Sequence, residues 1–226
     1  MRNIAVFYHT RLDGGEPPIN TDYALELLCE QMNCLYAARL DVAASEIIVG
    51  VTASSWAALA ARSALSDKAQ LIVHPEGSKS ELPTLSQLQR WLPGHEDWYV
   101  FYHHAKGVTA PTDEGKKNHR RVMTEATVVR WRQCVKDLDR GFDAVGINFV
   151  DPVYRQIPSN IGCHRFFAGN FWWAKASHLI KLPKLPSNAN NYATDRMLAE
   201  MWIGSLGIDF PVLDYERPQL SERWNL

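Results

Sequence analysis

The sequence predicts an α/β fold with a mostly parallel central sheet. In the first half of the chain, short apolar runs alternate with segments whose apolar residues recur at helical spacing. The apolar runs are continuous rather than alternating, which is typical of strands covered by helices on both faces. Helix-length connections join parallel strands through right-handed crossovers. We therefore expect a sheet packed between two layers of helices.

Four strands and three helices are expected between residues 4 and 103. The strands are rich in β-branched and aromatic residues. The first helix has apolar residues at 3-4-3 spacing from Leu25 to Leu35, after an N-cap at Asn20 or Thr21. The expected strands are 4–9, 46–52, 69–77 and 98–103, and the expected helices are 21–35, 54–65 and 84–92.

The second half of the chain is expected to differ in character. A long helix covers about 116–140, and a strand follows at 142–150. Residues 163–183 are interpreted as strand, tight Gly-Asn turn, strand and short helix. A helix at 194–207 has Thr194 or Asp195 as its N-cap and Gly207 beyond its end, and one short strand follows it. No segment has the composition of a linker, so we expect one domain over residues 1–226.

Composition limits the classes of partner. The chain has 226 residues and a net charge of −1, so no global field attracts nucleic acid or acidic lipid, and an anion must be bound by a local cluster. Four cysteines without a CxxC pair indicate a reduced protein. No apolar run approaches 18 residues. We expect a cytoplasmic protein without a transmembrane segment, with peripheral attachment to a membrane left open.

Several common catalytic motifs do not occur in the sequence. It has neither GxGxxG nor GxxxxGK[ST], which counts against a dinucleotide oxidoreductase and a P-loop kinase. It also has neither GxSxG nor HExxH, which counts against the common serine hydrolases and zinc proteases.

The first positive signal lies where the expected strands end. His9, His74 and His103 end three of the four strands, and "HHAKG" at 103–107 adds Lys106 and Gly107. Ligands of such sheets bind at the carboxyl ends of the strands. Cationic side chains and a glycine that admits backbone N–H groups suit a diphosphate there. A solvated loop whose histidines merely end strands is the alternative.

Two further segments of the sequence are charged. "KKNHRR" at 116–121 opposes the dipole at the start of the long helix, which favours an anionic ligand or, alternatively, a solvated helix face. The single DxD, Asp137 to Asp139, lies on the last turns of that helix, where residues two apart do not share a face. We expect it to be a surface feature and no metal site.

The second positive signal is the segment "GNFWW" followed by an acidic helix. Trp172 and Trp173 would point to opposite faces of a strand, one packed inside and one free to stack on a sugar. Asp195 and Glu200 lie about 140° apart around their helix, so only one is expected to face a cleft. A core tryptophan and an N-cap aspartate are the alternative interpretation.

Together these residues resemble the nucleotide-sugar glycosyltransferases of the GT-A fold. The alternating half from residue 4 to 103 matches the nucleotide-binding half of that fold, and "AGNFWWAKASHLIKLPKL" resembles its GGN segment before an acidic helix. "HAKG" at 104–107, "WR" at 131–132, "GNFWWA" at 169–174 and "EMWI" at 200–203 resemble, more closely, small bacterial glycosyltransferase-like proteins of polysaccharide loci.

The resemblance implies an α/β, GT-A-like, Rossmann-like sandwich and a glycosyltransferase of hexosyltransferase type. Residues 1–107 would form the nucleotide-binding half and 108–226 the acceptor and catalytic half. The donor would be a nucleoside-diphosphate sugar, and the acceptor would be a hydroxyl of a glycan or lipid-linked glycan. If the protein attaches to a membrane, it would be the bacterial inner membrane. The implied donor site comprises His9, Thr10, Thr52, His103, His104, Lys106 and Gly107, and the implied sugar and acceptor site comprises Asn170, Trp172 and Trp173.

Two points within this resemblance stay open. The family's DxD after the fourth strand, which holds a divalent cation, is replaced here by "HHAK", so dependence on Mn²⁺ or Mg²⁺ is uncertain, and Lys106 with a histidine would neutralise the diphosphate instead. The catalytic base is Asp195 by helix-start register or Glu200 by the closer resemblance, and a base acting directly on the acceptor implies inversion.

Three functions are alternatives to glycosyl transfer. The first is a non-catalytic nucleotide- or carbohydrate-binding domain of the same fold, for which the missing DxD argues. The second is a phosphoryl- or nucleotidyl-transfer enzyme, for which only Asp151 or Asp97 offers a carboxylate near the strand ends. The third, nucleic-acid binding, is disfavoured by the charge balance and by aromatic residues that are not interleaved with Lys and Arg.

Overall fold

The computed structural model describes residues 2–13, 18–75, 80–150, 165–186, 192–206 and 210–215, with no side-chain description for 192–194. Its strands are β1 (Ile4–Arg11), β2 (Glu46–Thr52), β3 (Ala69–His74), β4 (Tyr99–His104), β5 (Ala144–Gly146), β6 (Phe149–Val150), β7 (Phe166–Phe167), β8 (Trp172–Lys175) and β9 (Val212–Asp214). Its helices are α1 (Thr21–Ala37), α2 (Leu40–Ala43), α3 (Ser55–Ser63), α4 (Leu82–Trp91), α5 (Glu114–Thr124), the π-helix η1 (Glu125–Val129), α6 (Trp131–Asp139), α7 (Ala176–Leu179), α8 (Tyr192–Met201) and the 3₁₀-helix η2 (Trp202–Gly204).

Seven strands form the central sheet in the order β3-β2-β1-β4-β8-β5-β9, and β6 pairs with β7 in a small second sheet. Only β8 is antiparallel to its neighbours within the central sheet as described, so the sheet is mostly parallel and the predicted fold class is confirmed. Strands β1 and β4 lie side by side although almost ninety residues separate them. The chain adds strands on one side of β1 up to β3 and then crosses to the other side, and such a switch point is where sheets of this kind form a ligand crevice.

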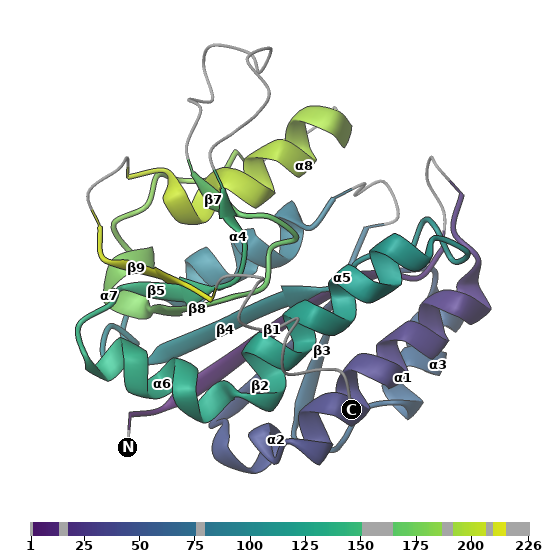
Figure 1. The fold of residues 1–226 in the computed structure, drawn as a ribbon. Coiled ribbons are helices and arrows are strands. Elements are labelled where there is room, and N and C mark those ends of the chain that lie inside the picture. The colour runs from purple at the N-terminus through teal and green to yellow at the C-terminus, as the bar shows by residue number, and fades with distance from the viewer. Residues whose placement is uncertain are drawn as a thin grey trace.

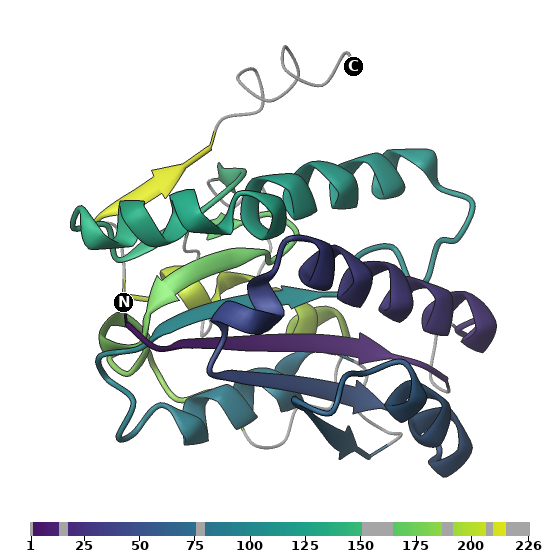
Figure 2. The ribbon, with the colours of Figure 1, turned by 90° about the horizontal axis from the view of Figure 1, so that it is seen from below.

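Two apolar cores cover the two faces of the sheet. One side packs against α1, α3 and α6, and the other packs against α4, α7 and α8. Figure 2 shows the sheet between the layer containing α1, α5 and α6 and the helix α4 on the opposite side. Because helices cover both faces, inner strands such as β1 are buried at every residue, which explains their continuous apolar sequences.

Most expected elements are present, with differences at their ends. The N-cap of α1 is Asn20, whose side chain accepts from Tyr23 N. Strand β1 extends to Arg11, two residues beyond the expected end. The expected strand at 142–150 is two short strands, and the acidic helix begins at Tyr192, so Asp195 lies within its first turn and is not the N-cap. Gly207 and Cys163 lie outside the described residues.

The expected long helix at 116–140 is interrupted by one π-helical segment, η1. The wider turn frees a backbone carbonyl: Thr127 O accepts the indole N–H of Trp173 at 2.9 Å, inside the core. The Thr127 hydroxyl in turn donates to Met123 O at 2.8 Å. The interruption therefore serves a hydrogen bond to the sheet, which the apolar spacing of the sequence does not reveal.

The expectation that Asp137 lies at the surface is wrong. Its side chain is 3% exposed, and it accepts hydrogen bonds from Tyr215 Oη at 2.6 Å and from Gln133 Nε2 at 3.0 Å. Arg140 donates to the same carboxylate at 3.0 Å. Asp137 of α6 thus holds Tyr215, the residue that follows β9. This contact joins segments far apart in the chain, so it has no local signal in the sequence.

Candidate functional site

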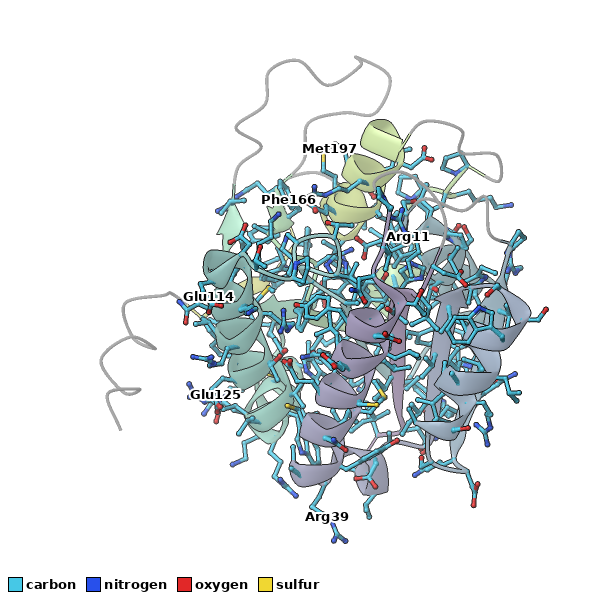
Figure 3. All side chains as sticks on the ribbon, turned by 90° about the vertical axis from the view of Figure 1, so that its right-hand side faces the viewer. Arg11, Arg39, Glu114, Glu125, Phe166 and Met197 are labelled. Atoms are coloured by element: carbon cyan, nitrogen blue, oxygen red, sulfur yellow. The ribbon has the colours of Figure 1, made fainter. Side chains whose placement is uncertain are left out.

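A cavity of about 130 Å³ opens at the carboxyl ends of β1 and β4. Figure 1 shows the two strands running together toward this edge, and Figure 3 looks onto it, with Arg11 at the end of β1 labelled below α8. The walls come from five parts of the chain: residues 9–11, residues 80–81, residues 104–109, Lys116 of α5, and Arg196 and Glu200 of α8. Segments far apart in the sequence therefore meet at one sheet edge.

The cavity gathers six of the twelve residues that the sequence assigned to a site. They are His9, Thr10, His104, Lys106, Gly107 and Glu200. The other six, which are Thr52, His103, Asn170, Trp172, Trp173 and Asp195, do not line it. Lys106 and Glu200 thus share one pocket, although they come from a loop and a helix that are almost a hundred residues apart.

The loop after β4 is held open by a glycine and an arginine. Gly107 has φ of +89°, which L side chains rarely adopt, and a Cβ there would touch Arg120 Nη1 and Lys116 Cβ at 3.4 Å. Arg120 is buried, donates to Lys106 O at 2.9 Å and pairs with Glu30 of α1 at 3.0 Å. Arg120 is therefore a structural anchor of the loop, and it fixes the backbone from which Lys106 enters the cavity.

Lys106 lies among charges of both signs. Burial lowers its pKa, Glu200 and Glu81 oppose that shift, and Arg196 and Lys116 add to it. Four cationic side chains line the cavity, Arg11, Lys106, Lys116 and Arg196, against the two carboxylates. An additional anion between these cations would relieve their mutual repulsion and the cost of desolvating Lys106.

Glu81 is the buried carboxylate of the cavity. Its Oε2 accepts from His104 Nδ1 at 2.7 Å, Tyr102 Oη at 2.8 Å and Asn170 Nδ2 at 2.8 Å. Burial alone would raise the pKa of Glu81, but the attraction and hydrogen bond of His104, together with the Tyr102 hydroxyl, lower it to about 2. Glu81 therefore orients His104 rather than offering a proton acceptor to a ligand.

His103 and Thr52 lie in the core and outside the cavity. Side chains alternate along β4, so His104 reaches the cavity while His103 points into the opposite layer. There it is fully buried, stacked on Phe101 at 4.7 Å and against Tyr8 at 4.6 Å. Neither of its ring nitrogens has a hydrogen-bond partner among the described residues, and burial lowers its pKa to about 3. Thr52 is likewise fully buried.

The expected free indole is not present. Trp172 is 1% exposed and Trp173 is 0% exposed. They do point to opposite faces of β8, but both faces are covered, because β8 is an interior strand between β4 and β5. Trp172 stacks on Tyr102 at 5.2 Å and Trp173 on Phe101 at 5.0 Å. Asn170 is buried too, and it joins Glu81 to Trp172 Nε1 through hydrogen bonds of 2.8 and 2.6 Å.

The two candidate bases on α8 occupy different positions. Glu200 lines the cavity with its side chain 8% exposed, and Arg196, one turn earlier, donates to it at 3.0 Å. Asp195 is buried and does not line the cavity. This agrees with the expected angular separation, which lets one of them face a cleft.

The sequence interpretation missed several lining residues. Arg11 was overlooked because the first strand was ended at His9, although continued alternation over two more residues would have included it. Ser80 and Glu81 precede a helix with Pro83 in its first turn, which marks a helix start but no chemistry. Arg196 shares its helix face with Glu200 at i, i+4 spacing, a signal that was available.

The described residues do not fit a divalent cation held in the manner of a DxD. No group of three or more His, Cys, Asp and Glu side chains among them is placed so that it could hold a metal ion. Glu81 Oε2 already accepts three hydrogen bonds, and Glu200 is paired with Arg196. Where a carboxylate pair would follow β4, the chain supplies His104 and Lys106, which repel a cation when charged. We therefore derive no step through a metal ion.

None of the helices in the described part of the chain is long and apolar enough to cross a bilayer.

Comparisons with known proteins identify the fold. No protein-family model and no curated protein matches the sequence. Among solved structures, the chain is similar to glucosyl-3-phosphoglycerate synthase of Mycobacterium tuberculosis, with a TM-score of 0.51, 16% identity, and coverage of 95% of this chain and 71% of that one.

The same mycobacterial enzyme in complex with Mn²⁺, uridine diphosphate and phosphoglyceric acid gives a TM-score of 0.48 at 14% identity, covering 95% of this chain and 68% of that one. CMP:2-keto-3-deoxy-manno-octonic acid synthetase complexed with CTP gives 0.45 at 11% identity, covering 98% and 96%. The chain therefore has a GT-A-like α/β fold.

Proposed function

We propose that this protein is a glycosyltransferase that moves a sugar from a nucleoside-diphosphate donor to a hydroxyl of a glycan or lipid-linked glycan acceptor in bacterial glycan synthesis. The observation that carries the proposal is the shared cavity at the sheet edge, where the ammonium group of Lys106 and the carboxylate of Glu200 line one space. The reaction would take place in the cytoplasm, or at the inner membrane when the acceptor is lipid-linked.

In this proposal the two halves of a single domain have different roles in the cavity. Residues 1–107 supply His9, Thr10, His104, Lys106 and the turn at Gly107, which suit the nucleoside and diphosphate. Residues 108–226 supply Lys116, Arg196 and Glu200. Thr52 and His103 are buried in the core and do not line the cavity.

The chemistry follows from the charges. The acceptor oxygen attacks the anomeric carbon as the bond from that carbon to the diphosphate oxygen breaks, and the electron pair of this bond stays on the diphosphate. Lys106, with His104 held by Glu81, stabilises the charge that develops there. The acceptor proton passes to the carboxylate of Glu200. Direct attack from the side opposite the leaving group inverts the anomeric centre.

One observation favours a second candidate, a non-catalytic binding domain of the same fold. Strand β4 ends in His103 and His104 rather than in the carboxylates that would hold a metal ion. A domain of this kind keeps the anion-binding cavity but does not turn over a donor.

A nucleotide screen tests the function. Melting temperatures are measured with uridine, guanosine, cytidine and thymidine diphosphates, each with and without Mn²⁺, and the best binder is then offered as its sugar conjugates in transfer and hydrolysis assays. A ligand at a hundred times its dissociation constant stabilises the fold by about 2.7 kcal/mol. Binding with turnover supports the transferase, and binding without turnover supports the binding domain. Stabilisation by none of the nucleotides contradicts both.

Glu200→Gln is expected to lower transfer by about 10²–10⁴-fold while nucleotide binding stays within about twofold, since the amide cannot take the acceptor proton. Asp195→Asn, compared in the same assay, tests the other acid. If Asp195→Asn removes turnover and Glu200→Gln does not, the base is not Glu200.

A further inference from the structure

Three buried polar side chains form a chain of hydrogen bonds that leads away from the cavity. His9 Nδ1 lies 2.8 Å from Thr84 Oγ1, and the same oxygen lies 2.9 Å from His74 Nε2. His9 lies two residues before the end of β1 and lines the cavity, Thr84 lies on α4, and His74 ends β3. All three residues are at most 7% exposed. The proposed reaction uses neither Thr84 nor His74.

A glycine on β2 leaves room for the hydrogen bonds between His9, Thr84 and His74. Strand β2 lies between β1 and β3, so one strand separates the two histidines. Gly50 on β2 faces the Thr84 hydroxyl and the ring of His74. A Cβ at Gly50 would overlap Thr84 Oγ1 and would lie 2.7 Å from His74 Nε2. The hydroxyl thus occupies the space that any other residue at position 50 would fill.

The two hydrogen bonds of Thr84 couple the tautomer of His9 to the tautomer of His74. Burial lowers the pKa of His9 to about 3 and that of His74 to about 4, so both rings are neutral near pH 7 and each carries one N–H. The Thr84 hydroxyl has one proton and no third hydrogen-bond partner among the described residues, so it donates to one imidazole and accepts from the other. Either His74 donates to Thr84 and Thr84 donates to His9, or the direction is reversed throughout.

The direction of these hydrogen bonds decides whether His9 offers a hydrogen-bond donor or an acceptor to a ligand in the cavity. If Nδ1 of His9 accepts from Thr84, its proton is on Nε2, which has no hydrogen-bond partner among the described residues and is left to donate to a ligand. In the reverse direction Nε2 presents a lone pair. A cavity lined by Arg11, Lys106, Lys116 and Arg196 attracts an anion, and a lone pair would repel it.

We propose that His9 is an anion-binding residue that donates from Nε2, as a neutral imidazole, to a phosphate oxygen, and that Thr84 and His74 are positioning residues that fix this tautomer. The phosphate is that of the donor diphosphate, so the inference rests on the proposed function. It adds a donor of hydrogen bonds that does not depend on charge, beside Lys106, and it gives buried residues outside the cavity a role in ligand recognition.

The test is a long-range ¹H–¹⁵N spectrum of the full chain labelled at histidine, with and without inorganic pyrophosphate, assigned with His9→Gln and His74→Gln. We expect His9 and His74 in the Nε2–H tautomer and a shift of the His9 Nε2 signal on binding. Thr84→Val, which keeps the shape and removes the hydroxyl, should mix the His9 tautomers and weaken pyrophosphate binding about tenfold. Thr84→Ser should retain both properties.

Three results overturn the inference: a His9 Nδ1–H tautomer in the complex, an unchanged tautomer and affinity in Thr84→Val, or no binding of pyrophosphate to the wild type. The wild-type spectrum decides the tautomer even if a variant fails to fold. Pyrophosphate binding with the expected tautomer, together with no turnover of any sugar donor, contradicts the transferase proposal alone and leaves this inference standing.

Discussion

Lys106 illustrates how one side chain is prepared for an anion. Its backbone is fixed by Arg120, its neighbour Gly107 turns the chain, and its ammonium group is mostly removed from water among other cations. Burial of the charged ammonium group beside Arg196 and Lys116 costs free energy in the absence of a ligand, and a bound diphosphate would offset that cost.

Lys106→Ala is therefore expected to abolish donor turnover and nucleotide binding while the melting temperature changes by no more than about 2 °C, because the variant removes a partly buried charge without breaking a hydrogen bond of the fold. Donor-hydrolysis kinetics and thermal melts measure the two effects. Lys117→Ala is the matched control, since Lys117 lies on the adjacent helix and pairs with Glu114. A wild-type rate in Lys106→Ala would refute the role of this residue.

The residues of the cavity differ in how well the sequence reveals them. Lys106 and His104 lie in one short polar segment after an apolar strand, so their position at the sheet edge follows from local pattern. Glu81 has no such signal: its importance comes from Tyr102 of β4, His104 and Asn170 before β8, which converge on one oxygen atom. Convergence of this kind depends on strand order, which the sequence pattern does not determine.

At the scale of elements, the π-helix η1 shows tertiary structure overriding a regular helix. A regular α-helix over 116–140 would direct the carbonyl of Thr127 to a backbone amide, whereas the wider turn directs it to the indole of Trp173. The elements with a strong apolar pattern and short connections, such as β2 and α1, were predictable almost to the residue. Interruptions such as η1 were not, because the partner is distant in sequence.

Trp173→Phe is expected to lower the free energy of unfolding by about 2–4 kcal/mol, since it leaves the buried carbonyl of Thr127 without its donor and opens a gap against Phe101. Trp56→Phe is the matched control at a position that is 60% exposed, where the change should stay within about 0.5 kcal/mol. Urea denaturation of both variants measures the difference. Equal costs would show that the hydrogen bond to η1 contributes nothing.

At the scale of the whole molecule, buried histidines link stability to pH. His9 and His103 have folded pKa values of about 3, below the unfolded value near 6.5. Between pH 6.5 and 3 the unfolded chain binds more protons than the native one, so stability is fully present above pH 6.5 and is lost as the pH falls toward 3. Glu81 adds to the loss only below pH 4.5.

Each such histidine contributes a slope of up to about 1.4 kcal/mol per pH unit in this range. His103→Leu, which replaces a buried imidazole without hydrogen-bond partners in the described structure by an apolar side chain of similar volume, should reduce the slope between pH 6 and 4.5 by about 1 kcal/mol per unit. Urea unfolding across this range measures it. A variant with the wild-type slope would mean that His103 is protonated in the folded state or is exposed to water.

The fold class was predictable because alternating strands and helices leave few topologies. The reversed direction of β8 was not, and it determines where the tryptophans lie: an interior strand covered on both faces has no free indole. The expectation of a stacking tryptophan failed for this reason, while the expectation that Lys106 and an acid of the last long helix share a cavity agrees with the described geometry.

The antiparallel direction of β8 has one more structural consequence. A strand running against its neighbours begins at the edge where they finish, so the turn before Trp172 delivers the amide of Asn170 to Glu81, a carboxylate contributed by the earlier half of the chain. Without Asn170, the carboxylate of Glu81 would keep only two of its three donors, Tyr102 and His104. The hydrogen bonds around Glu81 are thus completed by the turn before β8, and they join residues from both halves of the chain.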